Sequence, residues 1–178
     1  MRTISQEVDE QAVRAAAEAV PDPELPPVTL GMLGVLQTVE VGDDGAVRID
    51  LLPTFAGCPA TEMMERDVAA AVGAVEGVRD VTVRFVYDPP WSTDRITDDG
   101  RAALAEFGIA PPGAWANAVA DLPAGRRLPV APATSAAVAC PYCGSTQTTE
   151  DSPFGPTPCR AVHHCASCRQ PFEAFKPL

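Results

Sequence analysis

Cysteines are the side chains in this 178-residue sequence whose spacing points most directly to chemistry. Four of the six form two Cys-x-x-Cys pairs near the C-terminus, Cys140 with Cys143 and Cys165 with Cys168, and 21 residues separate the pairs. Two such pairs suit four thiolates around a tetrahedral zinc ion, one pair from each arm of a small β ribbon. A redox dithiol is the alternative, but neither pair sits in a recognisable thioredoxin-like βαβ frame.

The C-terminal segment that holds these pairs is short. From Cys140 to the end there are 39 residues, which seldom bury enough apolar surface to fold alone. Bound metal is therefore expected to supply folding free energy on the order of 10 kcal/mol. Four cysteines saturate a structural zinc, so Cys159 is predicted to be an ordinary strand residue, and His163 and His164 polar surface. Cys159 could instead bind or exchange metal if the ribbon folds over Cys58.

Cys58 stands apart from the other cysteines, where a predicted strand runs through Gly57-Cys58-Pro59 into a helix. Proline suits the first helical position, which predicts Cys58 as the N-cap. A thiol there faces unpaired backbone N–H groups and the positive end of the helix dipole, and both favour the thiolate that binds metals. The alternative is a small buried cysteine that fills a corner.

Acidic side chains could share this corner. The segment Asp22-Pro23-Glu24-Leu25-Pro26-Pro27 must be an extended turn, because each proline biases the preceding residue away from helix. Its two carboxylates are favoured as turn residues, and lining a site is the other interpretation. If Asp22, Glu24 and Glu62 lie near Cys58, they disfavour a thiolate until a cation neutralises the site.

The elements that must position these residues follow from apolar periodicity and turn residues. The first helix is expected to bury Val8, Ala12, Ala15, Ala16 and Ala19, and Gly42-Asp43-Asp44-Gly45 should close a hairpin. Strand, helix and strand over residues 47–87 form a right-handed crossover, with one face of the last strand firmly buried. The predicted elements are helix 5–20, strands 35–41 and 46–52, helix 59–76, strand 81–87 and helix 97–107.

The predicted fold class is α+β, with two parts. Residues 1–110 form a small two-layer αββαβα domain, and residues 139–178 form a C-terminal β zinc ribbon. Residues 111–138 are an Ala/Pro-rich linker, because five prolines interrupt any periodicity there. Trp91 is expected to cover the core, although an aromatic beside a thiol corner could also shield a bound cluster.

Charge narrows the function classes. The net charge is −11, and residues 1–110 hold 20 Asp and Glu against 8 Lys and Arg. Such a domain repels nucleic acid and anionic membranes, which leaves protein surfaces and metal ions as expected partners. No apolar run approaches the ~20 residues of a membrane span, and the first residues lack a signal peptide's apolar stretch. The predicted location is cytoplasmic.

Several motifs together resemble a known family. Asp22-Pro23-Glu24-Leu25-Pro26, Leu33-Gly34-Val35, and Thr54 with Gly57-Cys58-Pro59 are similar to the cluster-assembly domain family, whose members help install iron–sulfur clusters. Within that family, residues 154–160 and 165–173 resemble the tails of the D subunits of phenylacetyl-CoA epoxidase systems, called PaaD or PaaJ.

This resemblance implies an accessory maturation subunit rather than an enzyme. It implies that Cys58 is the reactive cysteine, that Asp22, Glu24 and Thr54 surround it, and that iron or an iron–sulfur cluster is transient cargo beside a structural zinc. The implied partners are the oxygenase and reductase subunits, and the protein could be a homodimer. The sequence has no Glu-x-x-His pair or dinucleotide glycine motif. The alternative is a structural adaptor that docks through its ribbon, with Cys58 inert.

Overall fold

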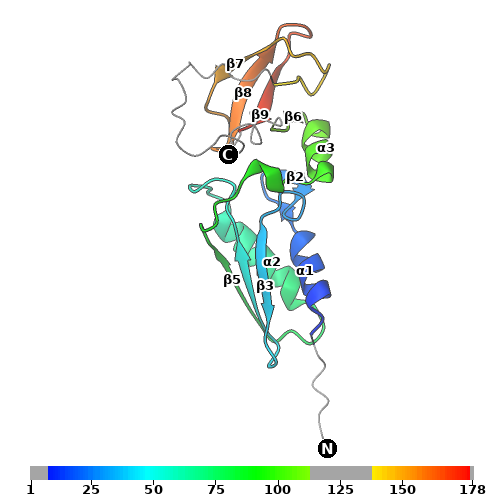
Figure 1. The fold of residues 1–178 in the computed structure, drawn as a ribbon, viewed down its shortest axis with the longest axis vertical. Coiled ribbons are helices and arrows are strands. Elements are labelled where there is room, and N and C mark those ends of the chain that lie inside the picture. The colour runs from blue at the N-terminus through cyan, green and yellow to red at the C-terminus, as the bar shows by residue number, and fades with distance from the viewer. Residues whose placement is uncertain (1–7, 113–137, 177–178) are drawn as a thin grey trace, which may run out of the picture. The chain divides into compact units, whose positions relative to one another are not determined.

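The computed structural model describes residues 8–112 and 138–176, and contacts divide the chain into two compact units (Figure 1). The first unit runs to Trp91 and adds residues 95–100, and the second holds residues 92–94 and everything from Arg101. Both units contain sheets, and helices cover the larger sheet of the first. The predicted α+β fold class is therefore confirmed.

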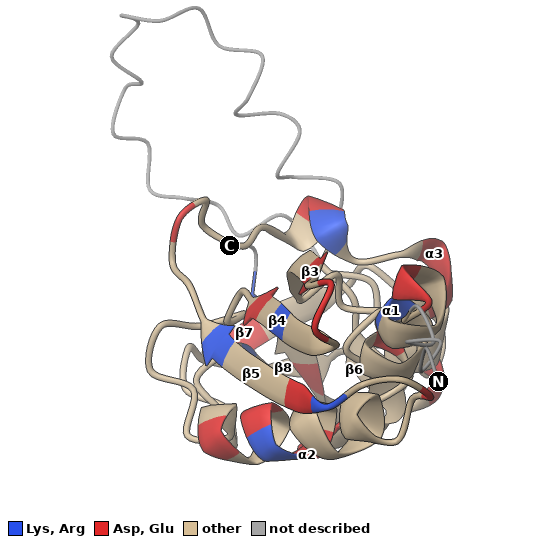
Figure 2. Ribbon diagram, turned by 90° about the horizontal axis from the view of Figure 1, so that it is seen from below, with Lys and Arg blue, Asp and Glu red and all other residues tan. Residues whose placement is uncertain are grey.

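The first unit is a three-stranded sheet with two helices on one face. β3 and β4 form an antiparallel hairpin, and β5 lies parallel to β4 after the crossover helix α2, in the order β3-β4-β5. α1 packs on α2 and β3, and α2 packs on β5 (Figure 2). The elements are α1 (Glu10–Glu18), β1 (Pro21–Asp22), β2 (Leu25–Thr29), β3 (Leu36–Val41), β4 (Ala46–Leu51), α2 (Thr61–Gly73) and β5 (Asp80–Phe85).

The core of this unit lies between the sheet and the helices. Alternate residues of β4 are buried, whereas Arg48 faces solvent. The antiparallel pairing of β3 with β4 and the parallel pairing of β4 with β5 confirm the predicted hairpin and crossover. β5 is only half-buried on its inner face because it is an edge strand, so the prediction of a firmly buried face is wrong. Buried side chains from the two elements are Val47, Ile49 and Leu51 of β4 and Met64, Val68 and Val72 of α2.

The buried stripe of α1 differs from the predicted one. Asp9 caps the helix, and its carboxylate accepts a hydrogen bond of 2.9 Å from the Gln11 N–H. Val13 and Ala17 are buried, whereas Ala15 and Ala19 are exposed. Valine buries more apolar area than alanine, so the helix turns Val13 toward the core. Residues 5–7 of the predicted helix lie outside the described residues.

The proline-rich segment after α1 forms a short two-stranded ribbon. β1 pairs with β2 in antiparallel fashion. Between them the Asp22 carboxylate accepts hydrogen bonds from the N–H groups of Glu24 (2.8 Å) and Leu25 (3.1 Å). Asp22 therefore does the turn chemistry favoured from the sequence. Trp91 also has its predicted place in the core, where its Nε1 donates to the Leu33 carbonyl at 2.9 Å.

The second unit is built on a four-stranded sheet in the order β6-β9-β8-β7. Ile109 and Ala110, which form β6, pair in parallel with β9 and so belong to the sheet of the second unit. Most of the predicted linker, residues 113–137, lies outside the described residues. Two elements are divided between the units, the 3₁₀ helix η1 (Thr93–Arg95) and α3 (Asp98–Glu106). The strands of the second unit are β6 (Ile109–Ala110), β7 (Thr148–Ser152), β8 (Arg160–Cys165) and β9 (Pro171–Phe175).

Helix length bears on membrane association. Across residues 8–112 and 138–176, no helix combines the length and the apolar character needed to span a bilayer.

Candidate metal centre and cysteine corner

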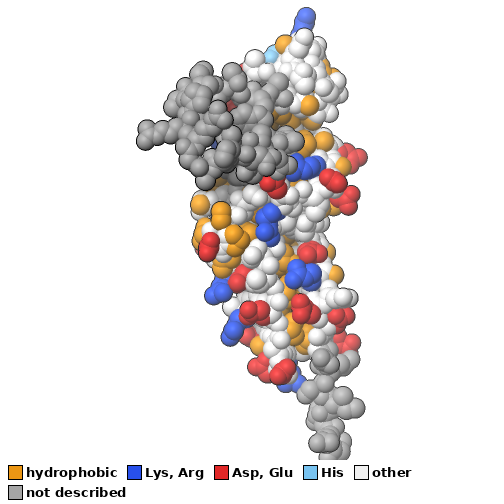
Figure 3. Space-filling model, in the orientation of Figure 1, with side chains coloured by type: hydrophobic (Ala, Val, Ile, Leu, Met, Phe, Trp, Pro, Cys, Tyr) orange, Lys and Arg blue, Asp and Glu red, His pale blue; other side chains and the backbone are white. Residues whose placement is uncertain are grey.

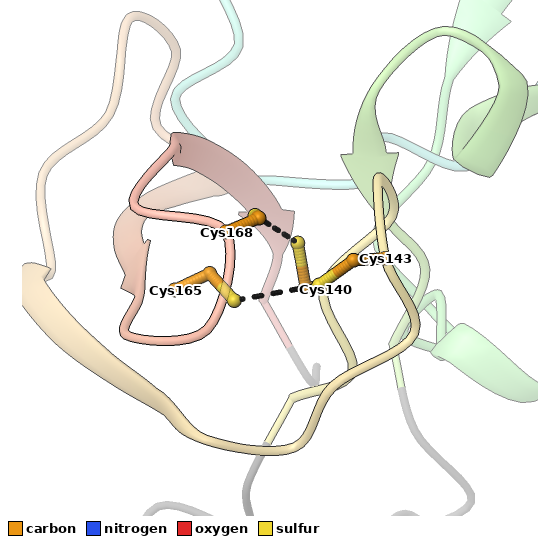
Figure 4. A group of neighbouring side chains, drawn as sticks. All are labelled: Cys140, Cys143, Cys165 and Cys168. Carbon is orange, nitrogen blue, oxygen red and sulfur yellow. Dashed lines mark hydrogen bonds between the residues drawn. The ribbon is translucent and has the colours of Figure 1, made fainter.

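Four cysteines meet at one end of the second unit's sheet. Cys140 and Cys143 lie in the turn before β7, Cys165 is the last residue of β8, and Cys168 lies in the turn before β9. Their side chains point toward one another (Figure 4). The two Cys-x-x-Cys pairs are thus brought together as the spacing predicted.

Both turns have the same backbone construction. The N–H after the second cysteine donates to the carbonyl of the first, from Gly144 to Cys140 and from Arg169 to Cys165, at 2.8 Å in each case. Gly144 has φ +72° and Arg169 has φ +60°. Glycine adopts this left-handed conformation freely, but an arginine there is uncommon, which marks the second turn as held in shape by its surroundings.

The sulfur spacing fits a four-coordinate metal. All four Sγ atoms lie within 4.8 Å of one another, with 3.7 Å between Cys140 and Cys168 and 3.6 Å between Cys143 and Cys165. A Zn–S bond of about 2.3 Å implies tetrahedral edges of about 3.8 Å. The donor set and its geometry therefore suit a thiophilic ion, and metal binding is the chemistry that this cluster supports.

Electrostatics at the cluster also favour a bound cation. The backbone N–H of Cys168, with that of Ser167, lowers the pKa of Cys165 to about 6 against the opposing effect of burial. The Gln170 N–H lowers the pKa of Cys168, but burial and the neighbouring thiols raise it to about 12 overall. One thiolate thus forms readily, and its negative charge disfavours ionisation of the next thiol. A divalent cation would offset this repulsion between thiolates.

Cys159 is not part of the cluster. Its half-buried Sγ lies 3.2 Å from the hydroxyl of Thr157, and its carbonyl accepts from the Lys176 N–H at 2.9 Å. The prediction of a strand residue is wrong by one position, because Cys159 lies in the turn directly before β8, which begins at Arg160.

The two histidines of β8 differ from the prediction. His163 is buried and stacks on Phe172, its cross-strand neighbour, with ring centroids 5.5 Å apart. Burial lowers the pKa of His163 below its ordinary value. The expectation of polar surface is wrong for His163, and His164 is half-buried.

A buried arginine in the ribbon was missed from the sequence. Arg160 donates through Nε to the Thr157 hydroxyl at 2.7 Å and through NH1 to the Glu173 carboxylate at 2.6 Å. The pair joins the start of β8 to β9. A lone arginine at the head of an apolar strand, with a glutamate in the next strand, was the available signal.

Cys58 lies before the helix rather than at its cap. α2 begins at Thr61, and its N-cap is Ala60, which makes no side-chain cap hydrogen bond, so the N-cap prediction is wrong. The chain closes a turn first, because the Cys58 N–H donates to the Phe55 carbonyl at 3.0 Å and the Thr61 hydroxyl donates to the Cys58 carbonyl at 3.3 Å. The Cys58 thiol is half-buried, so it is neither fully exposed to solvent nor a fully buried packing residue.

The acidic residues do not join Cys58 in a compact ion-binding group. Within the described residues, the four ribbon cysteines are the group of Cys, His, Asp and Glu side chains that gathers closely enough to hold an ion. The Asp22 carboxylate is engaged in its turn, and Glu24 follows in the same turn. Thr54 is half-buried in the segment between β4 and α2 that also carries Cys58.

Family models match both parts of the chain. Residues 10–85 match the iron–sulfur cluster assembly protein family, and residues 127–176 match the PaaD zinc beta ribbon domain. The protein is thus of the class that joins a cluster-assembly domain to a cysteine-rich ribbon.

Individual relatives narrow this class. The chain is 40% identical over 162 residues to a protein of Escherichia coli (strain K12) named as the putative D subunit of 1,2-phenylacetyl-CoA epoxidase, and the match covers 91% of this chain and 89% of that one. The chain belongs to the family of these D subunits, the PaaD family.

Other similarities cover between half and two thirds of the chain. An Fe-S protein maturation auxiliary factor of Porphyromonas gingivalis is 33% identical over 103 residues, 58% of this chain and 93% of the relative. A crystal structure of a domain of unknown function, DUF59, from Bacillus anthracis shares 32% identity with a TM-score of 0.50, over 53% of this chain and 90% of that one. The cluster-assembly family model, which matches residues 10–85, covers the region that carries Cys58.

Proposed function

We propose that this protein is a non-enzymatic maturation subunit of a phenylacetyl-CoA epoxidase system in the cytoplasm. It handles iron or an iron–sulfur cluster at Cys58, with Asp22, Glu24 and Thr54 as the accompanying motif residues, and delivers this cargo to the oxygenase or reductase subunits. The carrying observation is the 40% identity to an epoxidase D subunit over 91% of the chain. The match of residues 10–85 to the iron–sulfur cluster assembly family, and the similarity of the chain to an Fe-S protein maturation auxiliary factor, support the cargo.

The position of Cys58 supports a role in handing cargo over. The thiol is half-buried in the segment between β4 and α2, so it can be partly shielded from water and still be reached by a partner. Thiolates are the preferred ligands of iron–sulfur clusters. Because the helix starts three residues later than Cys58, its dipole stabilises the thiolate less than a cap position would, and the positive charge of the cargo supplies the rest.

We further propose that the ribbon holds structural zinc through Cys140, Cys143, Cys165 and Cys168. The support is the sulfur spacing of 3.6 and 3.7 Å and the closed set of four thiol donors, which leaves no coordination position for a substrate. When bound, zinc holds the two turns together and so stabilises the sheet between them. The four side chains orient one another through their common backbone turns.

The test of the proposed function is Cys58→Ser in a cell that depends on the epoxidase pathway for growth on phenylacetate. The variant should fold and keep its zinc, while the oxygenase and reductase are isolated short of iron or cluster. Cys159→Ser is the matched control, because Cys159 is also a half-buried cysteine outside the four-thiol cluster. Normal growth and fully loaded partner subunits in Cys58→Ser would contradict the proposal.

A second candidate function is a structural adaptor that docks on the oxygenase through its ribbon. The observation in its favour is that the Asp22 carboxylate is engaged in its own turn. An adaptor would tolerate Cys58→Ser fully. It would lose binding to the oxygenase when the four ribbon cysteines are replaced by serine together, which can be measured by co-purification.

A further inference from the structure

Large hydrophobic side chains are exposed at one edge of the first unit. Across the described residues of that unit, the exposed large hydrophobics are Phe55, Met63 and Tyr87, with 36%, 44% and 61% of their surface accessible. Scattered exposed apolar residues are normal on a protein surface, but a group of them marks an interaction site. We call these three residues the Cys58 collar.

The sheet topology explains why the Cys58 collar gathers at this edge. β4 and β5 are parallel, Leu51 pairs with Phe85, and the Val86 N–H donates to the Leu51 carbonyl at 2.8 Å. The segments that leave the two strands therefore emerge side by side, one toward Cys58 and the other toward Tyr87. In Figure 3 hydrophobic side chains cluster on the left of the first unit, over the segment before α2.

The net charge of the chain segments at this end of the sheet is negative. The chain segments 52–67 and 86–91 contain four carboxylates, Glu62, Glu65, Asp67 and Asp88, and Glu62 and Asp88 are exposed. The cation of these segments, Arg66, pairs with Asp67 at 2.8 Å, so the net charge stays negative. An apolar surface flanked by carboxylates is complementary to an apolar surface flanked by cations.

We propose that the Cys58 collar is the docking surface for the protein that receives the cargo, whose own patch is apolar with lysine or arginine at its rim. This inference rests on the proposed function of Cys58. A second copy of the chain fits poorly, because a two-fold contact would bring Glu62 and Asp88 of both copies into one interface. The Cys58 collar consists of one phenylalanine, one tyrosine and one methionine, and these three residue types are enriched at protein interfaces.

Docking at the Cys58 collar serves the transfer step itself. The bond between Cys58 Sγ and iron breaks as a cysteine sulfur of the recipient bonds to the same iron, and the proton of the incoming thiol passes to the departing Cys58 thiolate. No electron is transferred, so no oxidant or reductant is needed. Apolar contact around Cys58 excludes water from the exposed iron–sulfur bonds during this exchange.

The experiment measures cluster transfer from the loaded full-length chain to the apo form of the epoxidase system's iron–sulfur reductase. Tyr87→Ser and Met63→Ser should each slow transfer about tenfold at unchanged cluster loading, because exposed anchor residues carry much of the binding energy. Phe154→Ser is the matched apolar control, since Phe154 is 81% exposed in the other unit. It should transfer like the wild-type chain.

Charge reversal tests the acidic rim. Glu62→Lys should slow transfer and remove its dependence on salt, because it repels a basic partner. Glu76→Lys is the control. It reverses an exposed charge next to Gly77. Gly77 contacts the β3–β4 hairpin, at the end of the strands away from Cys58.

The outcomes separate the two proposals. A wild-type chain that loads cluster but transfers none contradicts the proposed function, and the docking proposal falls with it. Wild-type transfer that Tyr87→Ser, Met63→Ser and Glu62→Lys leave unchanged overturns the docking proposal alone. A concentration-dependent dimer that Tyr87→Ser dissolves, measured by sedimentation, would make a second copy the occupant and would also overturn it.

Discussion

The two cysteine regions of this protein differ in how much of their geometry is local. In the ribbon each Cys-x-x-Cys pair closes its own turn through a 2.8 Å hydrogen bond, and the two turns bring four sulfurs within 4.8 Å. At the corner, Cys58 depends on a turn before α2 and on the ends of two strands that are distant in sequence. Spacing therefore predicts the ribbon site well and the corner poorly.

The difference also concerns what each region needs for stability. The first unit has its own core of buried aliphatic side chains between the sheet and two helices. The ribbon's core is small, and two of its cysteines are buried members of it. Metal binding and folding are therefore one process in the ribbon and separate processes at the corner.

Zinc removal should produce the largest effect and tests this contrast directly. A chelator, or Cys165→Ser, is expected to unfold β7, β8 and β9, because metal supplies on the order of 10 kcal/mol to a domain of this kind. The first unit should stay folded. Amide hydrogen exchange measures both units in one sample, and a ribbon that keeps its protection without metal would contradict the prediction.

The next largest effect is expected from the ion pair inside the ribbon. Arg160→Met should cost about 3 kcal/mol of ribbon stability, because it leaves the Thr157 hydroxyl and the Glu173 carboxylate without their partner. Arg84→Met is the matched control, since Arg84 pairs with Asp50 on the open face of the first sheet. Denaturant unfolding of zinc-loaded protein measures both variants, and equal costs would refute the contrast.

A smaller effect is expected at the corner. Cys58→Ser should change the free energy of unfolding by less than about 1 kcal/mol, because a half-buried thiol and a hydroxyl differ little in size. In the zinc-loaded wild-type chain, iodoacetamide should label Cys58 before any of the four ribbon cysteines. Peptide mass spectrometry reads the sites, and ribbon labelling at the same rate would show that the four thiols are not metal-bound.

The smallest effect is a pH dependence in the first unit. The hydrogen bond from Arg84 holds the pKa of Asp50 below its ordinary value of 3.8, although burial opposes it. Because the folded-state pKa is the lower one, the pair stabilises the fold above pH 3.8 and this contribution is lost as the pH falls through the folded pKa. The stability difference between wild type and Asp50→Asn should shrink on acidification, measured by denaturant unfolding at about pH 6 and about pH 3.

Much of the fold could be predicted because its signals are short-range. The hairpin around Gly42–Gly45, the crossover through α2 and the buried Met64 and Val68 follow from turn residues and helical spacing. The buried stripe of α1 could not be predicted from the sequence, because its five predicted residues differ little in hydrophobicity from their neighbours. Contact with α2 and β3 decided that Val13 faces inward.

The sequence by itself determined the chemistry available to this protein: four thiols paired for a metal, one thiol at a strand-to-helix corner and an acidic first domain. Tertiary structure alone decided that β6 joins the ribbon sheet, that Arg160 is buried against Glu173, and that the segments carrying Cys58 and Tyr87 leave neighbouring strand ends. The physical reason is how far apart in the sequence the contacting residues lie. A Cys-x-x-Cys turn is closed by neighbours along the chain, whereas a shared sheet edge exists only after β4 and β5 have paired.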